Sequence, residues 1–293
     1  MHQGKQPAGR QGLGMALVLF STICLSAEAV AAKIAYQGGA TVLTTLTLRY
    51  LLAAAVFWLL VLAGGYDWRL SRRQLFIVSI LSVGAQTLTV LALFEAFRYI
   101  PGAMAILFLY FYPTVVTILA FFFLKEPLTW PKGAALLLTF LGCAVILGQP
   151  VGALNMKGVL LSLSAALTNA VFLVGTTRLL SGIQTTVYNA YLTTFVALTV
   201  GLLSLARGQF SLDFNLQALA AIGVLGIVCT VLALAALLRG VKEIGASRAA
   251  IISTFEPVAT AVLGFIILGE GLTAWQAAGG AVVLAGVFLQ RRD

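Results

Sequence analysis

Long runs of apolar residues, separated by short polar stretches, repeat along the whole chain. A bilayer core about 30 Å thick is crossed by a helix of roughly 20 apolar residues. Ten runs approach that length, and they cover residues 13–32, 42–63, 75–94, 101–124, 131–148, 157–176, 187–206, 216–238, 247–268 and 275–289. The pattern predicts an all-α integral membrane protein with ten transmembrane helices.

Two stretches, 100–142 and 244–286, align without a gap at a shift of 144 residues, which is the separation of Pro113 and Pro257. They share a Phe-x-Pro motif and a Leu-x-Glu-x-Leu-Thr motif. A duplicated apolar unit with a proline inside each copy is typical of transporters built from two repeats. Within a single structural domain we therefore expect an N-terminal tail at 1–12, a first five-helix repeat at 13–148, a linker at 149–156, a second repeat at 157–289 and a C-terminal tail at 290–293.

Composition agrees with a lipid environment and excludes several classes of function. Hydrophobic residues make up 61% of the chain and charged residues 9%, whereas soluble domains are about 25% charged. The net charge is +9, but the basic residues lie in short loops without interleaved aromatics, so no nucleic-acid partner is expected. The single histidine, His2, lies in the tail, the three cysteines are far apart, and no phosphate-binding glycine loop occurs. We therefore expect no metal, no cofactor and no direct use of ATP.

Loop charges orient the predicted helices. Thirteen lysines and arginines fall on the side that holds both termini, and four, Lys33, Arg98, Lys157 and Arg207, fall on the other. This bias predicts cytoplasmic termini in a multi-pass protein of a bacterial inner membrane. Because each repeat has five spans, an odd number, the second repeat is expected to be inverted relative to the first.

A competing interpretation makes the first apolar run a cleavable signal peptide. Lys5 and Arg10 precede this run, and it ends among alanines. Cleavage would leave a first repeat of four helices opposite a second of five, so the repeat argues that the run is retained.

With these motifs in view, the sequence resembles the drug/metabolite transporter superfamily, and specifically its ten-helix members built from two EamA-type repeats. The resemblance rests on 48–54 in the second segment, on the Lys-Glu-Pro-Leu of 125–128 and on the Phe-Glu-Pro-Val of 255–258. It implies export or import of amino acids, other metabolites or amphipathic drugs through a cavity lined mainly by helices 1, 3, 4, 6, 8 and 9. The second repeat has Thr193 where the first has Arg49, and helix 1 lacks the tryptophan of many members. These departures weaken the expectation of an aromatic-lined substrate site.

Glu256 is predicted near the middle of the ninth helix, beside Pro257. Pro257, like Pro113 in the first repeat, is expected to interrupt its helix, because proline removes one backbone hydrogen bond and frees a carbonyl. A charge at that depth is costly unless it is paired, hydrated or protonated. Two interpretations stay open: a site for a substrate amine or a proton, and a structural residue that hydrogen-bonds a neighbouring helix. Thr254, on the same helix, is a further substrate-binding candidate.

Glu28 lies in the second half of the first segment, where it could pair with Lys33 or with Arg49 of the next helix. Desolvation favours the neutral form of a carboxyl group and a nearby arginine favours its charged form, which is how a proton-coupled carboxylate is tuned. A coupling or substrate-binding site and a plain structural ion pair with Arg49 are both compatible with the sequence.

Four more side chains are candidates for contact with a substrate. Gln86 and Asn169 are amides predicted inside the third and sixth helices, and amides cost more to bury than the hydroxyl groups around them. Tyr110 and Tyr112 precede Pro113, and a tyrosine ring with its polar tip could hold an amphipathic solute. Because the two tyrosines are two residues apart on a helix, we expect at most one to face the cavity.

These features predict a secondary transporter, an exporter or facilitator of small amphipathic metabolites, with amino acids as the favoured class. It would work as a monomer by alternating access around a central cavity, with protons as a candidate coupling ion. The main alternative is a flippase or carrier for lipid-linked or other organic solutes, such as drugs or nucleotide-like metabolites. A membrane-embedded enzyme is less favoured, since the acids are scattered and no histidine lies in an apolar segment.

Overall fold

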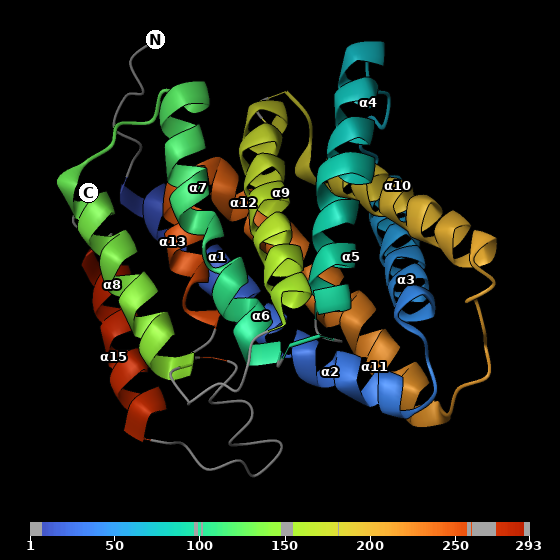
Figure 1. The fold of residues 1–293 in the computed structure, drawn as a ribbon. Helices are drawn as coiled ribbons and strands as arrows, with labels where there is room; N and C mark the ends of the chain where they lie inside the picture. Colours follow the sequence, from blue (N-terminus) through green and yellow to red (C-terminus); the bar gives the residue numbers. More distant parts are fainter. Residues whose placement is uncertain are drawn as a thin grey trace.

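The computed structural model describes residues 8–96, 99–100, 102–147, 155–180, 182–256, 259 and 274–289. Over these residues the chain is a bundle of helices without a strand (Figure 1). Six of the described helices are long and apolar enough to cross a membrane: Gln11–Gln37, Val42–Ala63, Arg72–Ala96, Met156–Leu180, Thr185–Ala206 and Leu216–Ile244. The all-α membrane fold predicted from the apolar runs is therefore confirmed.

Several predicted spans are built from more than one helical segment. In the first repeat the elements are α1 (Ala8–Ser26), α2 (Glu28–Gln37), α3 (Val42–Ala63), α4 (Arg72–Ser79), π-helix η1 (Ile80–Gln86), α5 (Thr87–Ala96), α6 (Gly102–Leu109), α7 (Tyr112–Leu119), π-helix η2 (Ala120–Leu124) and α8 (Trp130–Leu147). In the second repeat they are α9 (Met156–Leu180), α10 (Thr185–Ala206), α11 (Leu216–Gly226), π-helix η3 (Ile227–Leu232), α12 (Ala233–Ile244), α13 (Ala246–Ser253) and α15 (Ala274–Leu289). Pro257, and most of the predicted ninth span after Glu256, lie outside the described residues.

The two repeats are inverted relative to each other, as the pairing of α3 with α10 shows. Each is the second span of its repeat, and the two pack along one another. Thr41, just before α3, donates to the carbonyl of Gln209, just after α10, at 3.0 Å. At the other end Tyr191, near the start of α10, donates to the carbonyl of Trp68, beyond the end of α3, at 3.1 Å. Equivalent helices thus run in opposite directions, which is the predicted inverted arrangement.

Close contacts between helices recur in the two repeats at the same shift of 144 residues. A Cβ added to Gly14 of α1 would lie 2.5 Å from Ile244 of α12, and one added to Gly158 of α9 would lie 2.8 Å from Ile100. Gly158 and Ile244 are the residues 144 positions after Gly14 and Ile100. The contact of α1 with α12 is therefore repeated by the contact of α9 with the end of the third span. Glycine lets these backbones approach closely, which is how membrane helices gain packing energy.

The fourth and ninth spans are interrupted at equivalent positions. In the fourth, α6 ends at Leu109 and α7 begins at Tyr112, and the amide of Phe111 donates to the carbonyl of Phe108, three residues back, at 3.2 Å. In the ninth, the amide of Phe255 donates in the same way to Ile252, at 3.1 Å. In the fourth span the break immediately precedes Pro113, whose missing N–H cannot continue the helical ladder. Each break leaves backbone polar groups available at mid-span.

Some helices extend beyond their predicted ends. α9 continues to Leu180 and includes Arg178, which the apolar run excluded. The guanidinium of Arg178 donates to the carbonyl of Phe123 at the end of the fourth span, so the charge is placed at a helix end where polar groups are accessible. α12 likewise continues to Ile244 and carries Lys242 in its last turn.

Candidate substrate cavity

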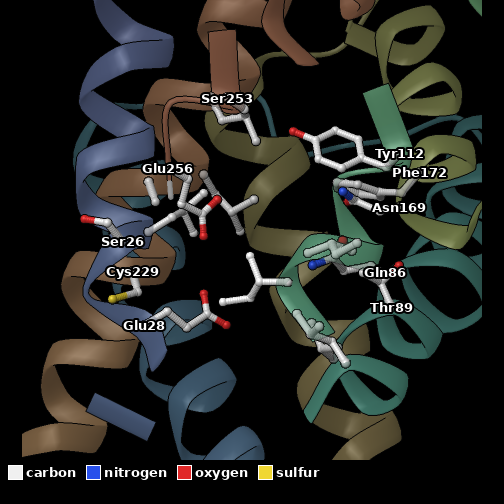
Figure 2. A pocket seen from close by; sticks show the side chains of 18 of the residues that line it. Ser26, Glu28, Gln86, Thr89, Tyr112, Asn169, Phe172, Cys229, Ser253 and Glu256 are labelled. Atoms are coloured by element: carbon white, nitrogen blue, oxygen red, sulfur yellow. The ribbon is translucent and has the colours of Figure 1, made fainter. Parts of the chain in front are cut away.

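A cavity of about 150 Å³ lies between the helices of the two repeats. Figure 2 shows Glu28 and Glu256 on one side and Gln86, Thr89 and Asn169 on the opposite side. The lining residues are related by the repeat: seven pairs of them are separated by 144 positions, namely Leu25 and Asn169, Glu28 and Phe172, Thr89 and Ala233, Val90 and Leu234, Leu93 and Leu237, Leu109 and Ser253, and Tyr112 and Glu256. The cavity therefore lies where the two inverted repeats meet.

The break between α1 and α2 places Glu28 at the start of α2, facing Arg49 of α3. The Arg49 guanidinium binds the carboxylate with two nitrogens, at 2.8 and 3.2 Å. The Arg49 side chain is only 4% exposed and that of Glu28 18%. This two-point geometry is the strongest form of an arginine–carboxylate pair. The structural ion pair, one of the two interpretations of Glu28, is therefore present.

Other contacts hold Arg49 in place. Its Nε donates to the Thr230 hydroxyl at 2.6 Å, and its guanidinium lies 5.3 Å from the centre of the Tyr50 ring and 6.0 Å from that of Phe94. Most of its donors are thus engaged, and its charge is balanced by Glu28. Arg49 is poorly available to an anionic group of a solute.

Glu256 is in a different electrostatic position. It follows the break in the ninth span, and its carboxylate points into the cavity in Figure 2. Glu28 lies on the same side of the cavity as Glu256 (Figure 2). Among the described residues no lysine or arginine forms an ion pair with Glu256. With both carboxylates ionised, the described lining residues carry one negative charge without a cationic partner, and such a charge is costly inside a membrane.

The opposite wall presents amide groups. Gln86 donates to the Tyr50 hydroxyl at 3.3 Å, while its buried carbonyl oxygen Oε1 has no partner within the described part of the chain. Asn169 of α9 lines the same wall, and no hydrogen bond of its side chain occurs among the described residues. Buried polar atoms normally have partners, so these amides leave room for a polar group of a solute or for water.

Two π-helices shape this region. In η1 and just after it, the Thr87 hydroxyl donates to the carbonyl of Ser82 at 2.8 Å, and in η3 the Thr230 hydroxyl donates to that of Leu225 at 2.7 Å. Both bonds reach five residues back, as the wider π turn requires, and such bulges occur often at functional sites. The bulges lie in the third and eighth spans, at Gln86 and at Thr230, which binds Arg49.

The structure brings together most of the residues predicted from sequence. Glu28, Arg49, Gln86, Tyr112, Asn169 and Glu256 all line the cavity. Tyr110 and Thr254 do not: Tyr110 is 4% exposed in a buried cluster, and Thr254 lies in the break with its hydroxyl on the carbonyl of Ile251. Sequence reasoning missed Tyr50, which follows Arg49 in the motif, and Phe172, which the repeat shift relates to Glu28.

A buried apolar cluster packs between α7, α9 and α13 and includes Val116, Leu173 and Ile252. Glu126 adds a polar connection there: its carboxylate accepts from the backbone of Ala246 at the start of α13, at 3.2 Å. The bond connects the loop after η2 to the start of α13. Its repeat equivalent, Glu270, lies outside the described residues.

Comparison with known proteins agrees with this architecture. The EamA-like transporter family matches the chain twice, over residues 12–148 and 156–291. An uncharacterized transporter of Archaeoglobus fulgidus is 29% identical over 65% of this chain and 68% of its own length. The uncharacterized transporter YcbK of Bacillus subtilis is 26% identical over 91% of this chain and 88% of its own. One solved crystal structure, 20% identical, matches 94% of this chain and 95% of its own with a TM-score of 0.81, which shows a shared fold.

Proposed function

This chain belongs to the EamA-like transporter family and is a multi-pass membrane transporter of small solutes, and we propose that it carries amine-bearing solutes, amino acids first among them, by alternating access to the central cavity. The loop charges favour placement in the inner membrane of a bacterium with both termini in the cytoplasm, and export is the direction that we propose.

The observation that carries this proposal is the imbalance between the two cavity carboxylates. Glu28 is neutralised by Arg49 at 2.8 Å, whereas Glu256 has no cationic partner in the described structure. Either a proton or an ammonium group would remove the cost of the Glu256 charge. If the two compete for the same carboxylate, uptake of one releases the other, and this exchange would couple solute movement to protons.

The position of the cavity supports alternating access. It lies between inverted repeats, where an exchange of conformation between the two halves would open the site to the opposite face. The breaks before Tyr112 and before Glu256 place a lining residue just after each interruption. Helix ends of this kind are positions where backbone angles change during domain movement.

The size of the cavity favours a small solute over a lipid-linked one. Its volume of about 150 Å³ is below the range of roughly 300 to 1,000 Å³ of drug-sized ligand sites. For an amino acid, the ammonium group would face Glu256, and the Asn169 amide would offer a donor to the carboxylate, while Oε1 of Gln86 would accept from water or from a donor group of the solute. Arg49, engaged by Glu28, would contribute little to that end.

The test is counterflow in liposomes that contain the purified transporter. Each labelled solute is presented with and without a proton gradient, using a neutral amino acid, its decarboxylated amine and its N-acetylated derivative. Exchange of the amino acid and of the amine, with none of the acetylated compound, would support an ammonium site. Exchange of the acetylated compound at the same rate would refute the amine requirement.

A further inference from the structure

A second hollow, which we call the side groove, lies between α3, α5, α9 and α10. Its volume of about 940 Å³ compares with 150 Å³ for the central cavity. Leu88, Leu91, Leu161 and Leu203 form much of its apolar wall, and Lys157 and Arg207 line its polar end. The transport proposal makes no use of this groove.

The apolar wall reaches deep into the hydrocarbon layer. Leu88 is 53% exposed and lies eight residues before Ala96, the end of α5. At a rise of 1.5 Å per residue, that is about 12 Å from the helix end. In a protein that spans the membrane, this depth lies within the hydrocarbon layer. Leu88 therefore offers the groove an apolar surface at the depth of the lipid chains.

The polar end of the groove carries two positively charged side chains, although such residues are few on this side of the protein. Only four lysines and arginines were assigned to the side away from the termini, and two of them, Lys157 and Arg207, line this groove. Lys157 donates to the Tyr99 hydroxyl at 2.7 Å and lies 4.4 Å from the centre of that ring, which fixes its direction. Glu95 also lines the groove and accepts from Tyr99 at 3.3 Å. Among the described residues that line the groove, these two cations and this one acid give a net charge of +1.

The loop after Arg207 is held firmly. The carbonyl of Gln209 accepts from the hydroxyls of Thr41 and Thr44, at 3.0 and 3.2 Å. The amide of Ser211 in turn donates to the Thr44 hydroxyl at 3.2 Å. Arg207 itself forms no ion pair with any described residue. A fixed backbone thus carries an arginine whose charge is available beside the apolar wall.

We infer that the side groove binds an anionic phospholipid from the leaflet opposite the termini. The phosphate would bind at the polar end of the groove, which Lys157 and Arg207 line, and one acyl chain would follow Leu88 and Leu91 toward the bilayer centre. Charge and shape both support a lipid over a free anion. Arginine binds phosphate oxygens in pairs, and an acyl chain matches the leucines that line the groove together with Ser164 and Thr168. Basic residues at a membrane surface attract anionic headgroups in the same way.

The experiment measures thermal stabilisation of the detergent-purified transporter as a function of added lipid. Phosphatidylglycerol is compared with phosphatidylcholine of the same chains and with glycerol 3-phosphate. Saturable stabilisation by phosphatidylglycerol alone is expected. Its apparent affinity should fall about fivefold in Arg207→Gln and about thirtyfold in Arg207→Gln with Lys157→Gln, since each surface cation contributes a similar free energy.

The matched control is Arg73→Gln, an exposed cation at the opposite end of the bundle, which should leave phosphatidylglycerol affinity unchanged. Equal stabilisation by both lipids, or an unchanged affinity in the double variant, would overturn the proposal. So would full stabilisation by glycerol 3-phosphate, because the groove would then be a site for small anions. The transport proposal is tested separately, since counterflow in phosphatidylcholine liposomes does not depend on this lipid.

Discussion

Where the two repeats meet at the central cavity, they contribute matched apolar pairs but unmatched polar residues. Val90 faces the cavity with its equivalent Leu234, and Leu93 with Leu237. At the polar positions, by contrast, Glu28 is matched by Phe172, Tyr112 by Glu256 and Leu25 by Asn169. The apolar part of the cavity wall therefore follows the repeat, whereas the polar side chains that the proposed recognition uses do not.

This difference concerns two properties that a transporter built from two repeats must combine, namely movement between conformations and recognition of a solute. The proposed alternating mechanism would use the equivalent helix breaks and apolar contacts of the two repeats. The proposed recognition of an amine uses Glu256, which stands at one of two equivalent positions. A substitution in one repeat can therefore be compared with a substitution at the equivalent position of the other repeat, which serves as its control.

The largest effect is expected at the buried ion pair. Arg49→Met leaves the Glu28 carboxylate without its partner, and breaking a buried pair in this way costs about 3 to 5 kcal/mol. Thr193→Val, at the equivalent position of the second repeat, removes only a hydroxyl bonded to its own helix and should cost below about 1 kcal/mol. Thermal or denaturant unfolding in detergent measures the stability of both variants. Equal losses of unfolding free energy in the two variants would show that the ion pair of Arg49 with Glu28 contributes no stability.

The next effect concerns transport. Glu256→Gln removes the negative charge that the proposed amine contacts, so the KM of the amine should rise at least about thirtyfold, the scale of a lost buried charge contact. In the wild type a lower pH should weaken uptake, because protons compete for Glu256, and in the variant this dependence should disappear. Tyr112→Phe, at the equivalent position, should change KM by less than about fivefold. A KM that is unchanged in Glu256→Gln would remove the assignment.

A smaller effect tests the symmetry of the packing. Gly14→Ala and Gly158→Ala each force a methyl group against an isoleucine, and overpacking of this kind costs about 1 to 3 kcal/mol. The two losses should agree closely. Gly12→Ala on the same helix as Gly14 meets nothing within 4 Å, so it should be neutral or slightly stabilising. Unfolding midpoints give the comparison, and a loss at only one of the two glycines would count against equivalent packing.

The smallest effects are expected at the π-helices. Thr87→Val removes a hydroxyl bond within its own helix, which in membranes averages about 0.6 kcal/mol. Thr230→Val removes a similar bond and also the acceptor for Arg49 at 2.6 Å, so it should cost more, about 1.5 kcal/mol. If both variants lose the same stability, the contact of Thr230 with Arg49 contributes nothing measurable.

The fold could be predicted from sequence because apolar length and internal repetition are direct signals. The second predicted span, 42–63, coincides with α3, and the break before Pro113 follows from the missing proline N–H. The π-helices could not be predicted, since a shift from four-residue to five-residue bonding leaves no mark in composition. The extension of α9 through Arg178 was missed because its tertiary partner, the carbonyl of Phe123, is remote in sequence.

The candidate site was only partly predictable. Both cavity carboxylates and both amides could be identified from the sequence, because ionisable and amide groups are rare in apolar segments. It could not decide whether Glu28 pairs with Lys33 or with Arg49, since that depends on how the first two spans pack. Nor could it determine which of Tyr110 and Tyr112 lines the cavity, because the helix is interrupted between them.

The central claim is that Glu256 exchanges a proton for the amine of the solute. The most direct measurement is proton release when the best amine from the counterflow panel binds the purified transporter in weakly buffered detergent, followed with a pH-sensitive dye. We predict release of up to about one proton per transporter in the wild type and none in Glu256→Gln at saturating amine. Equal release by the two proteins would contradict the account.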